Sequence, residues 1–449
     1  MKIIIPAAPV FESIMGLQRY NKDESYKKSE FLFPCRVGDD YAVYNSFNGM
    51  LALMSEQEYN VFSSGRPSNS LLEQLVCNWF YIKSNTQIFE EYKKLRGLAL
   101  FFARKNALKN FTVLTTTDCN ARCFYCYEKN LKRISMDNDC AEKTAEFIAK
   151  SCNKNAVRLN WFGGEPLYNL EAIDTICNKL NGLGIKYRSK MISNALLFDR
   201  QVIEKAKKLW RLRRVQITLD GTEENYNRIK AYISRDAKNP FARVIDNIGL
   251  LTENNIFVDI RLNISENNID DMAVLVDFLA ERFTGTDKIN VVSALLYQLR
   301  DSIEDGSEKN MRFSEKIFSI NEKIFKSGLY RETISHSLYT FNNCMADSPD
   351  TAIISPDGRL YKCEHYVPEE NVGDINTGIT DTERLRFWKS ERYFGGCRTC
   401  AFTPICNHLE NCENIGSDCG RIKKRLTEQM FEYRIINSVK KYLYSNNNS

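Results

Sequence analysis

Residues 115–129 read TTTDCNARCFYCYEK and place Cys119, Cys123 and Cys126 in a CxxxCxxC pattern. The motif directly follows the apolar run 111–116, FTVLTT, which has the composition of a buried strand. With fifteen cysteines in 449 residues, three cysteines at these spacings are expected by chance only roughly 0.016 times in the chain. Since three thiolates on one short loop can hold three irons of a four-iron cluster and leave the fourth open, the motif predicts an iron–sulfur site. A zinc knuckle or a set of buried thiols is the alternative.

The segments around the motif alternate between two types. Short apolar or β-branched runs, typical of buried strands, are separated by segments with a helical pattern of apolar residues. This alternation predicts an α/β fold in which six parallel strands curl into a partial (β/α)6 TIM-like barrel. Ligands bind at the carboxyl ends of the strands in such folds, which is where the cysteine motif would lie. The expected strands span 111–116, 157–162, 186–193, 214–219, 256–263 and 288–294, and the expected helices span 137–151, 170–183, 199–210, 240–254 and 269–283.

Charge and hydrophobic patterning exclude several classes of protein. The chain has 62 Lys and Arg against 57 Asp and Glu, with no long basic run, so we expect neither a nucleic acid nor a membrane as partner. Pro6 and Pro9 interrupt the apolar N-terminus, so no signal peptide is expected, and no stretch reaches the roughly 20 apolar residues of a membrane span. We therefore expect a soluble cytoplasmic protein, in which reduced thiols bind metal rather than form disulfides.

A second group of cysteines lies late in the chain. Because the sequence has only three histidines, His336, His365 and His408, a metal site there is expected to use thiolates. The CxxC pair Cys397 and Cys400, taken alone, is more typical of zinc, so at least one late zinc site is the alternative. The group comprises Cys344, Cys363, Cys397, Cys400, Cys406, Cys412 and Cys419. The remaining cysteines, Cys35, Cys77, Cys140, Cys152 and Cys177, are expected to pack as small hydrophobic side chains, with one exposed thiol among them as the alternative.

A CxxxCxxC motif after the first strand of a six-unit partial barrel resembles the radical S-adenosylmethionine (SAM) superfamily. The resemblance implies a [4Fe–4S] cluster on Cys119, Cys123 and Cys126, whose open iron binds the amino and carboxylate groups of SAM. It also implies that one electron cleaves the sulfonium of SAM to give a 5′-deoxyadenosyl radical. Tyr125 stands where the family has an aromatic residue before the last cysteine.

The segment after the second expected strand matches another motif of the family. Gly163, Gly164, Glu165 and Pro166 correspond to its GGEP, in which the backbone and the carboxylate hold the methionine amino group. A carboxylate suits an ammonium partner, and glycine permits a close approach of the backbone.

Cofactor contacts are also implied after the third, fourth and fifth strands. Ser193 and Asn194 match a ribose-facing Thr-Asn pair, and Thr218 and Asp220 match a Ser-x-Asp-Gly motif that lines the cofactor. Asp220 and Arg261 could equally cap and pair within the barrel. The further positions implied by the resemblance are Gly221, Arg261 and Asn263, together with a basic residue that is either Arg228 or Lys230.

The late cysteines resemble the SPASM extension of the same superfamily, CX9-15GX4C followed by CX2CX5CX3C and a final cysteine. Thirteen residues precede Gly358 and four follow it, as the extension requires, but five residues rather than three separate Cys406 from Cys412. The resemblance implies two auxiliary [4Fe–4S] clusters, which makes three clusters in all. One would be held by Cys397, Cys400, Cys406 and Cys419, and the other by Cys344, Cys363 and Cys412, with His365, His408 or a substrate thiolate as fourth ligand.

The N-terminal part of the chain has a different pattern of expected strands and helices. Residues 30–53 predict two or three short strands, and 55–63, 70–82 and 86–96 predict helices. This architecture resembles the winged-helix leader-recognition domain of peptide-modifying enzymes, in which a precursor peptide adds a strand to a sheet edge. The expected domains are a leader-recognition module (1–105), a radical SAM barrel (106–310), bridging helices (311–340) and a SPASM domain with a C-terminal helix (341–449).

The resemblance implies a peptide maturase of the sactipeptide or ranthipeptide type, which joins a cysteine sulfur to a carbon of a ribosomally made peptide. Its partners would be a precursor peptide with a leader and an electron donor such as flavodoxin or ferredoxin. The alternatives are a maturase that joins carbon to carbon and an anaerobic sulfatase maturase that forms formylglycine. From another class, the chain could be a peptide-binding scaffold whose clusters are structural.

Overall fold

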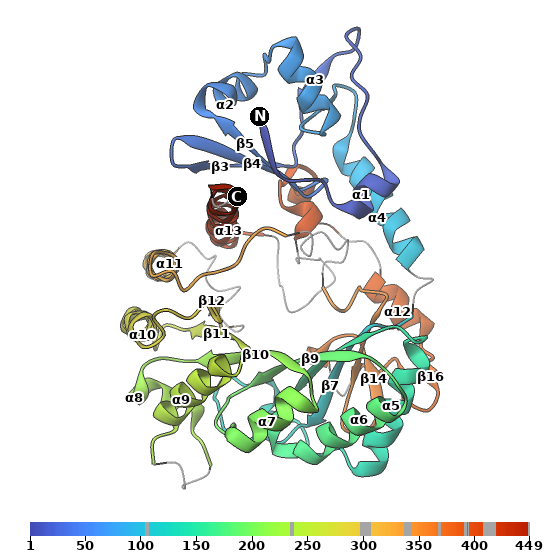
Figure 1. Ribbon diagram of the computed structural model, residues 1–449, viewed down its shortest axis with the longest axis vertical. Helices are drawn as coiled ribbons and strands as arrows, with labels where there is room; N and C mark the ends of the chain where they lie inside the picture. Colours follow the sequence, from blue (N-terminus) through green and yellow to red (C-terminus); the bar gives the residue numbers. More distant parts are fainter. Residues whose placement is uncertain are drawn as a thin grey trace. The chain divides into compact units, whose positions relative to one another are not determined.

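The computed structural model describes residues 1–103, 107–233, 238–296, 307–335, 344–366, 370–389, 393, 395–406 and 419–447. The chain divides into two compact units (Figure 1). The N-terminal unit comprises Met1–Lys105, Glu332–Cys344 and Glu391–Ser449, and the barrel unit comprises Asn106–Arg331 and Met345–Ser390. No helix of the described residues is both long and apolar enough to cross a membrane.

The core of the barrel unit is a run of six neighbouring parallel strands in the spatial order β12-β11-β10-β9-β8-β7. The prediction of a mostly parallel sheet with alternating helices is thus confirmed, and each strand begins and ends within two residues of its expected bounds. The strands are β7 (Asn110–Thr116), β8 (Val157–Gly163), β9 (Tyr187–Ser193), β10 (Leu212–Leu219), β11 (Phe257–Ile264) and β12 (Ile289–Leu295).

Alternation along the strands separates an outer from an inner face. In β8, Val157, Leu159 and Trp161 are buried, whereas Arg158 is exposed and Asn160 is half-buried. Because successive side chains of a strand point to opposite faces, the apolar set packs on the surrounding helices and the polar set lines the inner face. The helices are α5 (Asn138–Ser151), α6 (Leu170–Gly182), α7 (Arg200–Lys208), α8 (Glu223–Lys230), α9 (Pro240–Glu253), α10 (Ile269–Arg282) and α11 (Glu308–Lys326) (Figure 1).

Four short strands extend the sheet beyond β7. The first, β13 (Thr351–Ile354), runs parallel to β7, and β14 (Arg359–Tyr361), β15 (Gly373–Asp374) and β16 (Gly378–Ile379) follow as antiparallel neighbours. Gly358 makes the tight turn before β14 with φ +80°, and a Cβ atom there would lie 2.9 Å from Cδ1 of Ile375. The sequence pattern did not predict this extension, because strands of two to four residues carry too little alternation to be recognised. The unit also contains α12 (Thr382–Lys389).

The N-terminal unit is built on a four-stranded antiparallel sheet in the order β1-β5-β4-β3. Helix α13 (Arg421–Asn447) covers one face, where the Tyr44 and Phe431 ring centroids are 5.1 Å apart. The expected helix 70–82 is shorter, since Trp79 adopts a left-handed φ of 64° and the chain then enters a strand. The elements are β1 (Lys2–Ile5), α1 (Pro9–Ile14), β2 (Tyr26–Lys28), β3 (Leu32–Val37), β4 (Asp40–Asn45), β5 (Met50–Ser55), α2 (Glu56–Ser63), α3 (Asn69–Cys77), β6 (Tyr81–Lys83) and α4 (Ile88–Ala103).

Candidate active site

The three cysteines of the motif lie on the loop that follows β7, at the carboxyl edge of the parallel sheet. Two backbone hydrogen bonds fasten this loop to the segment at the end of α8. The Arg122 N–H donates to the Lys230 carbonyl across 2.8 Å, and the Ile233 N–H donates to the Asn120 carbonyl across 2.9 Å. The loop is therefore held at its base by a helix that follows the fourth strand.

The three cysteines of the motif are half-buried. Among the described residues, no three His, Cys, Asp or Glu side chains converge to hold one metal ion. Burial raises the pKa of Cys119 to about 12 and raises that of Cys126 above its ordinary value. Bound iron would favour the thiolate forms, since metal ligation requires deprotonation.

Asn120 directly follows the first cysteine. Its side-chain amide is buried, and only one of its two polar atoms has a hydrogen-bond partner among the described residues. Its Oδ1 accepts a hydrogen bond from Nδ2 of Asn194 across 2.6 Å, whereas its own Nδ2 has no partner among the described residues. A buried donor without an acceptor is costly, so this amide is suited to a ligand that supplies one. SAM carries carboxylate and hydroxyl acceptors, which fit this requirement. Sequence reasoning missed Asn120, although its place beside Cys119 was the available signal.

Gly163 and Gly164 bring the end of β8 against the chain that leads to Cys119. A Cβ atom on Gly163 would lie 2.1 Å from the carbonyl oxygen of Thr116, and one on Gly164 would lie 2.2 Å from that of Asp118. Gly163 also has φ +115°, which side chains rarely adopt. Both glycines are thus required by contact between the two loops.

Glu165 is fully buried and joins the loops after β8 and β9. Its carboxylate accepts hydrogen bonds from the Ser193 hydroxyl group at 2.8 Å, the Asn194 N–H at 2.8 Å and the Leu167 N–H at 3.1 Å. Burial raises its pKa to about 7, although these bonds favour the charged form. Through these hydrogen bonds Glu165 connects two predicted site residues, Ser193 and Asn194. Pro166 next to it begins the short 3-10 turn Pro166–Asn169 and is buried.

A buried triad connects the cluster loop to the end of β10. The Tyr125 hydroxyl group lies 2.9 Å from Oδ1 of Asp220, and Nζ of Lys230 lies 3.0 Å from Oδ2 of the same carboxylate. Burial opposes the charged form of Lys230, yet the Asp220 carboxylate raises its pKa well above the ordinary value. Arg228 is instead exposed and donates to Asn225. Of the two basic residues that the sequence left open, Lys230 is the one that lies in this triad.

Thr218 and Arg261 are opposite each other in the β10–β11 pairing, on the half-buried inner face. Nε of Arg261 donates to Oδ1 of Asn263 across 3.0 Å. The predicted SAM contacts therefore come from neighbouring strands of one sheet, β7 to β11, or from the loops that follow them.

The late cysteines are distributed over both units. Cys363 lies in the barrel unit two residues before His365, whose ring centroid is 4.4 Å from that of Tyr127. In the N-terminal unit, the Cys400 N–H donates to the Cys397 carbonyl across 3.3 Å and the Cys406 N–H donates to the Thr403 carbonyl across 3.4 Å. Cys344 is half-buried and Cys419 is exposed. Cys412, His336 and His408 lie outside the described residues, so both auxiliary ligand sets stay predictions.

Comparison with known proteins identifies the barrel. Residues 113–279 match the model of the Radical SAM superfamily. The chain is 24% identical to a GTP 3',8-cyclase of Clostridium perfringens over 301 residues, which are 62% of this chain and 87% of that protein. It is 22% identical over 280 residues to the radical SAM cyclopropyl synthase TigE of Paramaledivibacter caminithermalis, with 58% and 54% covered. The solved structure of anSMEcpe with bound AdoMet and Cp18Cys peptide shares the fold, with TM-score 0.51 and 17% identity over 76% of this chain and 99% of that one.

The matched segment begins in β7 and ends in α10, so it contains the cysteine loop, the glycine contact and the Asp220 triad. Its motif residues and its fold agree on one cofactor chemistry, that of SAM and a four-iron cluster. Residues 113–279 therefore form a radical SAM domain.

Proposed function

We propose that this enzyme joins a cysteine sulfur to a carbon atom within a ribosomally made precursor peptide. The observation that supports a peptide substrate is the edge strand β3 of the N-terminal unit. Among the described strands, β3 pairs only with β4, and Pro34 and Arg36 are exposed along it. Proline is tolerated where a backbone N–H would point away from the sheet, as at an edge. An extended leader peptide can add a strand there.

A peptide substrate is also supported by the shared fold of anSMEcpe, which has been solved with AdoMet and a peptide. In the proposal, residues 1–105 bind the leader while the inner face of the barrel unit receives the segment to be modified. A one-electron donor such as flavodoxin or ferredoxin supplies the reducing electron. The late cysteines hold the two auxiliary clusters.

In the proposal, each group of site residues has its own role. Cys119, Cys123 and Cys126 hold the first cluster, and Lys230 and Asp220 fix their loop. When bound, SAM and the clusters would supply a carbon-centred radical that takes up one hydrogen atom and an acceptor for one further electron. The peptide loses one carbon–hydrogen bond and one sulfur–hydrogen bond, gains one carbon–sulfur bond and releases one proton, so atoms and electrons balance.

Mass spectrometry of a cysteine-containing precursor, encoded by a short reading frame beside the gene, tests this function. After anaerobic incubation with SAM and dithionite, we expect a loss of two hydrogen atoms together with a thiol that no longer reacts with iodoacetamide. The same mass loss with a reactive thiol would indicate a carbon–carbon link instead, and an aldehyde would indicate formylglycine. The matched control is Cys123→Ala, which should cleave no SAM. Intact precursor beside rapid SAM cleavage would contradict the proposal.

A further inference from the structure

A cavity of about 640 Å³ lies within the barrel unit, along the amino-terminal halves of β7 to β10. Five basic side chains but only one carboxylate, that of Glu364, are among the residues that line it. Closed barrels fill their interior with layers of apolar side chains. This interior is open and strongly basic, and the SAM contacts described above lie at the opposite, carboxyl ends of the same strands. The basic residues are Arg158, Arg188, Lys190, Arg213 and Arg214.

Like charges occupy neighbouring positions across the sheet. Arg158 is in register with Arg188 on the next strand, and Lys190 is in register with Arg214 on the one after. Like charges directly opposite each other destabilise a sheet. Arg214 is partly neutralised by Asp259, whose Oδ2 is 3.3 Å from Nη1. Arg158, Arg188 and Lys190 form no ion pair with any residue that the structure describes.

The pKa of Lys190 shows how the surrounding atoms act on this charge. Its side chain is accessible from the cavity, yet burial lowers its pKa below the ordinary value. Glu364 and Asp259 oppose this effect, and Arg214 adds to it. An anion that entered the cavity would relieve the repulsion and would interact more strongly than at an open surface.

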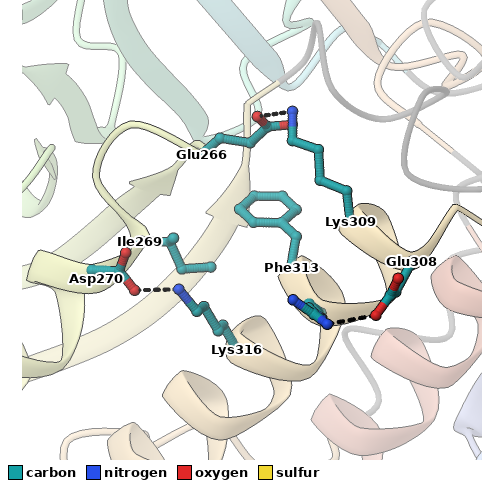
Figure 2. A pocket seen from close by; sticks show the side chains of 8 residues that line it. Glu266, Ile269, Asp270, Glu308, Lys309, Phe313 and Lys316 are labelled. Atoms are coloured by element: carbon teal, nitrogen blue, oxygen red, sulfur yellow. Dashed lines mark hydrogen bonds and ion pairs between the residues drawn. The ribbon is translucent and has the colours of Figure 1, made fainter.

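A pocket elsewhere in the same unit shows that such an excess of charge is not general. The pocket between α10 and α11 has about 620 Å³ and also contains basic residues (Figure 2). There, each cation has its own carboxylate: Lys309 lies 2.5 Å from Glu266, Arg312 lies 2.5 Å from Glu308, and Lys316 pairs with Asp270. Unpaired positive charge is thus a property of the barrel cavity.

One of the residues that line the cavity, Asn160, has a buried acceptor without a donor. Nδ2 of Asn160 donates to Oγ1 of Thr112 across 3.3 Å, whereas its Oδ1 is buried without a partner among the described residues. Asn160 is in register with Lys190. A ligand that satisfies both must combine an anionic group with an N–H donor. An acidic residue within a peptide has both, in its side-chain carboxylate and its backbone amide.

We infer that the barrel cavity selects peptides with an acidic residue, whose carboxylate binds Arg158, Arg188 and Lys190 while a backbone N–H donates to Asn160. Planar guanidinium groups match a carboxylate with two parallel hydrogen bonds, which adds geometric selectivity. The inference rests on the proposed function, because it assumes that the substrate is a peptide. It adds the chemical class of the residue that enters the barrel.

Binding of two short probes tests the inference on the full, cluster-loaded chain. Calorimetric titration with acetyl-Gly-Glu-Gly-amide and with its Gln counterpart should show about tenfold tighter binding of the Glu peptide, since charge-assisted hydrogen bonds are about twice as strong as neutral ones. In Arg188→Gln and Lys190→Met this preference should disappear, whereas Asn160→Ala should weaken both peptides equally. Arg312→Gln in the α10–α11 pocket is the matched control and should keep the full preference.

Thermal unfolding separates a binding role from a structural one. Without ligand, Arg188→Gln should melt at the same or a higher temperature than the parent chain, because the substitution removes repulsion. Equal binding of both probes to the parent chain would overturn the inference, and so would tighter binding of GTP than of the Glu peptide. If the precursor is modified while the probes bind equally, the inference alone fails. If the probes are distinguished through Arg188 while no precursor is modified, the proposed function alone fails.

Discussion

The hydroxyl group of Tyr125 donates a hydrogen bond of 2.9 Å to the carboxylate of Asp220, which also pairs with Lys230. Tyr125 lies between Cys123 and Cys126, whereas Asp220 follows β10, so this contact links the cluster loop to the sheet. Both Asp220 and Lys230 are buried. A charge that loses its partner in such a position has no access to water.

Replacing Lys230 by Met should therefore destabilise the chain by about 3–5 kcal/mol, since it leaves the Asp220 carboxylate buried and unpaired. The double variant Lys230→Met, Asp220→Asn should recover part of this loss. Urea unfolding under anaerobic conditions measures both. Arg228→Met, two residues earlier on the same helix and exposed, should change the free energy of unfolding by no more than about 0.5 kcal/mol. Equal losses in Lys230→Met and Arg228→Met would show that the buried pair has no special role.

Gly164→Ala should abolish cluster binding, because the added Cβ would lie 2.2 Å from the Asp118 carbonyl oxygen and push the Cys119 loop away. Iron content and the visible absorption of the reconstituted protein measure the effect. Gly182→Ala, in α6 with no atom within 4 Å of the new Cβ, is the matched control. It should bind iron normally and gain about 0.5–1 kcal/mol of stability, since alanine favours a helix over glycine. Full iron content in Gly164→Ala would mean that the loops tolerate separation.

Glu165 predicts a pH dependence of stability. Burial raises its pKa to about 7 from an ordinary value of 4.5, so between these values the folded state keeps a proton that the unfolded state loses. The free energy of unfolding should therefore fall as the pH rises through this window, by roughly 3 kcal/mol in all. Glu165→Gln, which cannot ionise, should lack this decrease. Urea unfolding from pH 5.5 to 8 compares the two, and parallel pH curves would contradict the assignment.

The sequence predicted the strands of the barrel unit better than the contacts between the loops that follow them. Alternating apolar runs located the six parallel strands β7 to β12, because each buried strand of seven or eight residues shows its periodicity. The contacts of Glu165 with Ser193 and Asn194 could not be predicted, since they depend on how two loops meet after folding. The burial of Lys230 could not be predicted either, because the sequence does not show that Lys230 faces the interior on α8 while Arg228 faces solvent. The charge of the barrel cavity arises from strand register, which single segments do not reveal.

The five cysteines outside the metal motifs should differ in reactivity. Cys35, Cys152 and Cys177 are buried, as predicted, whereas Cys77 and Cys140 are half-buried. Burial raises the pKa of Cys35 and Cys177 to about 12 and that of Cys140 to about 11. Iodoacetamide at pH 8, followed by peptide mass mapping, should therefore label Cys77 first and leave the three buried thiols unmodified. In urea all five should react at similar rates. Early labelling of Cys152 in the native protein would contradict the burial.

The late cysteines predict the iron content. Three four-iron clusters require about twelve irons per chain after anaerobic reconstitution, whereas the first cluster alone requires about four. Replacing both Cys397 and Cys400 by alanine should remove about four irons and leave the SAM-dependent signal of the first cluster, since Cys119, Cys123 and Cys126 lie on a separate loop. Elemental analysis for iron and zinc on the same samples measures this. Zinc in place of the missing iron would show that the CxxC pair binds a structural ion, and the proposed electron acceptor would then have to be the cluster of Cys344, Cys363 and Cys412.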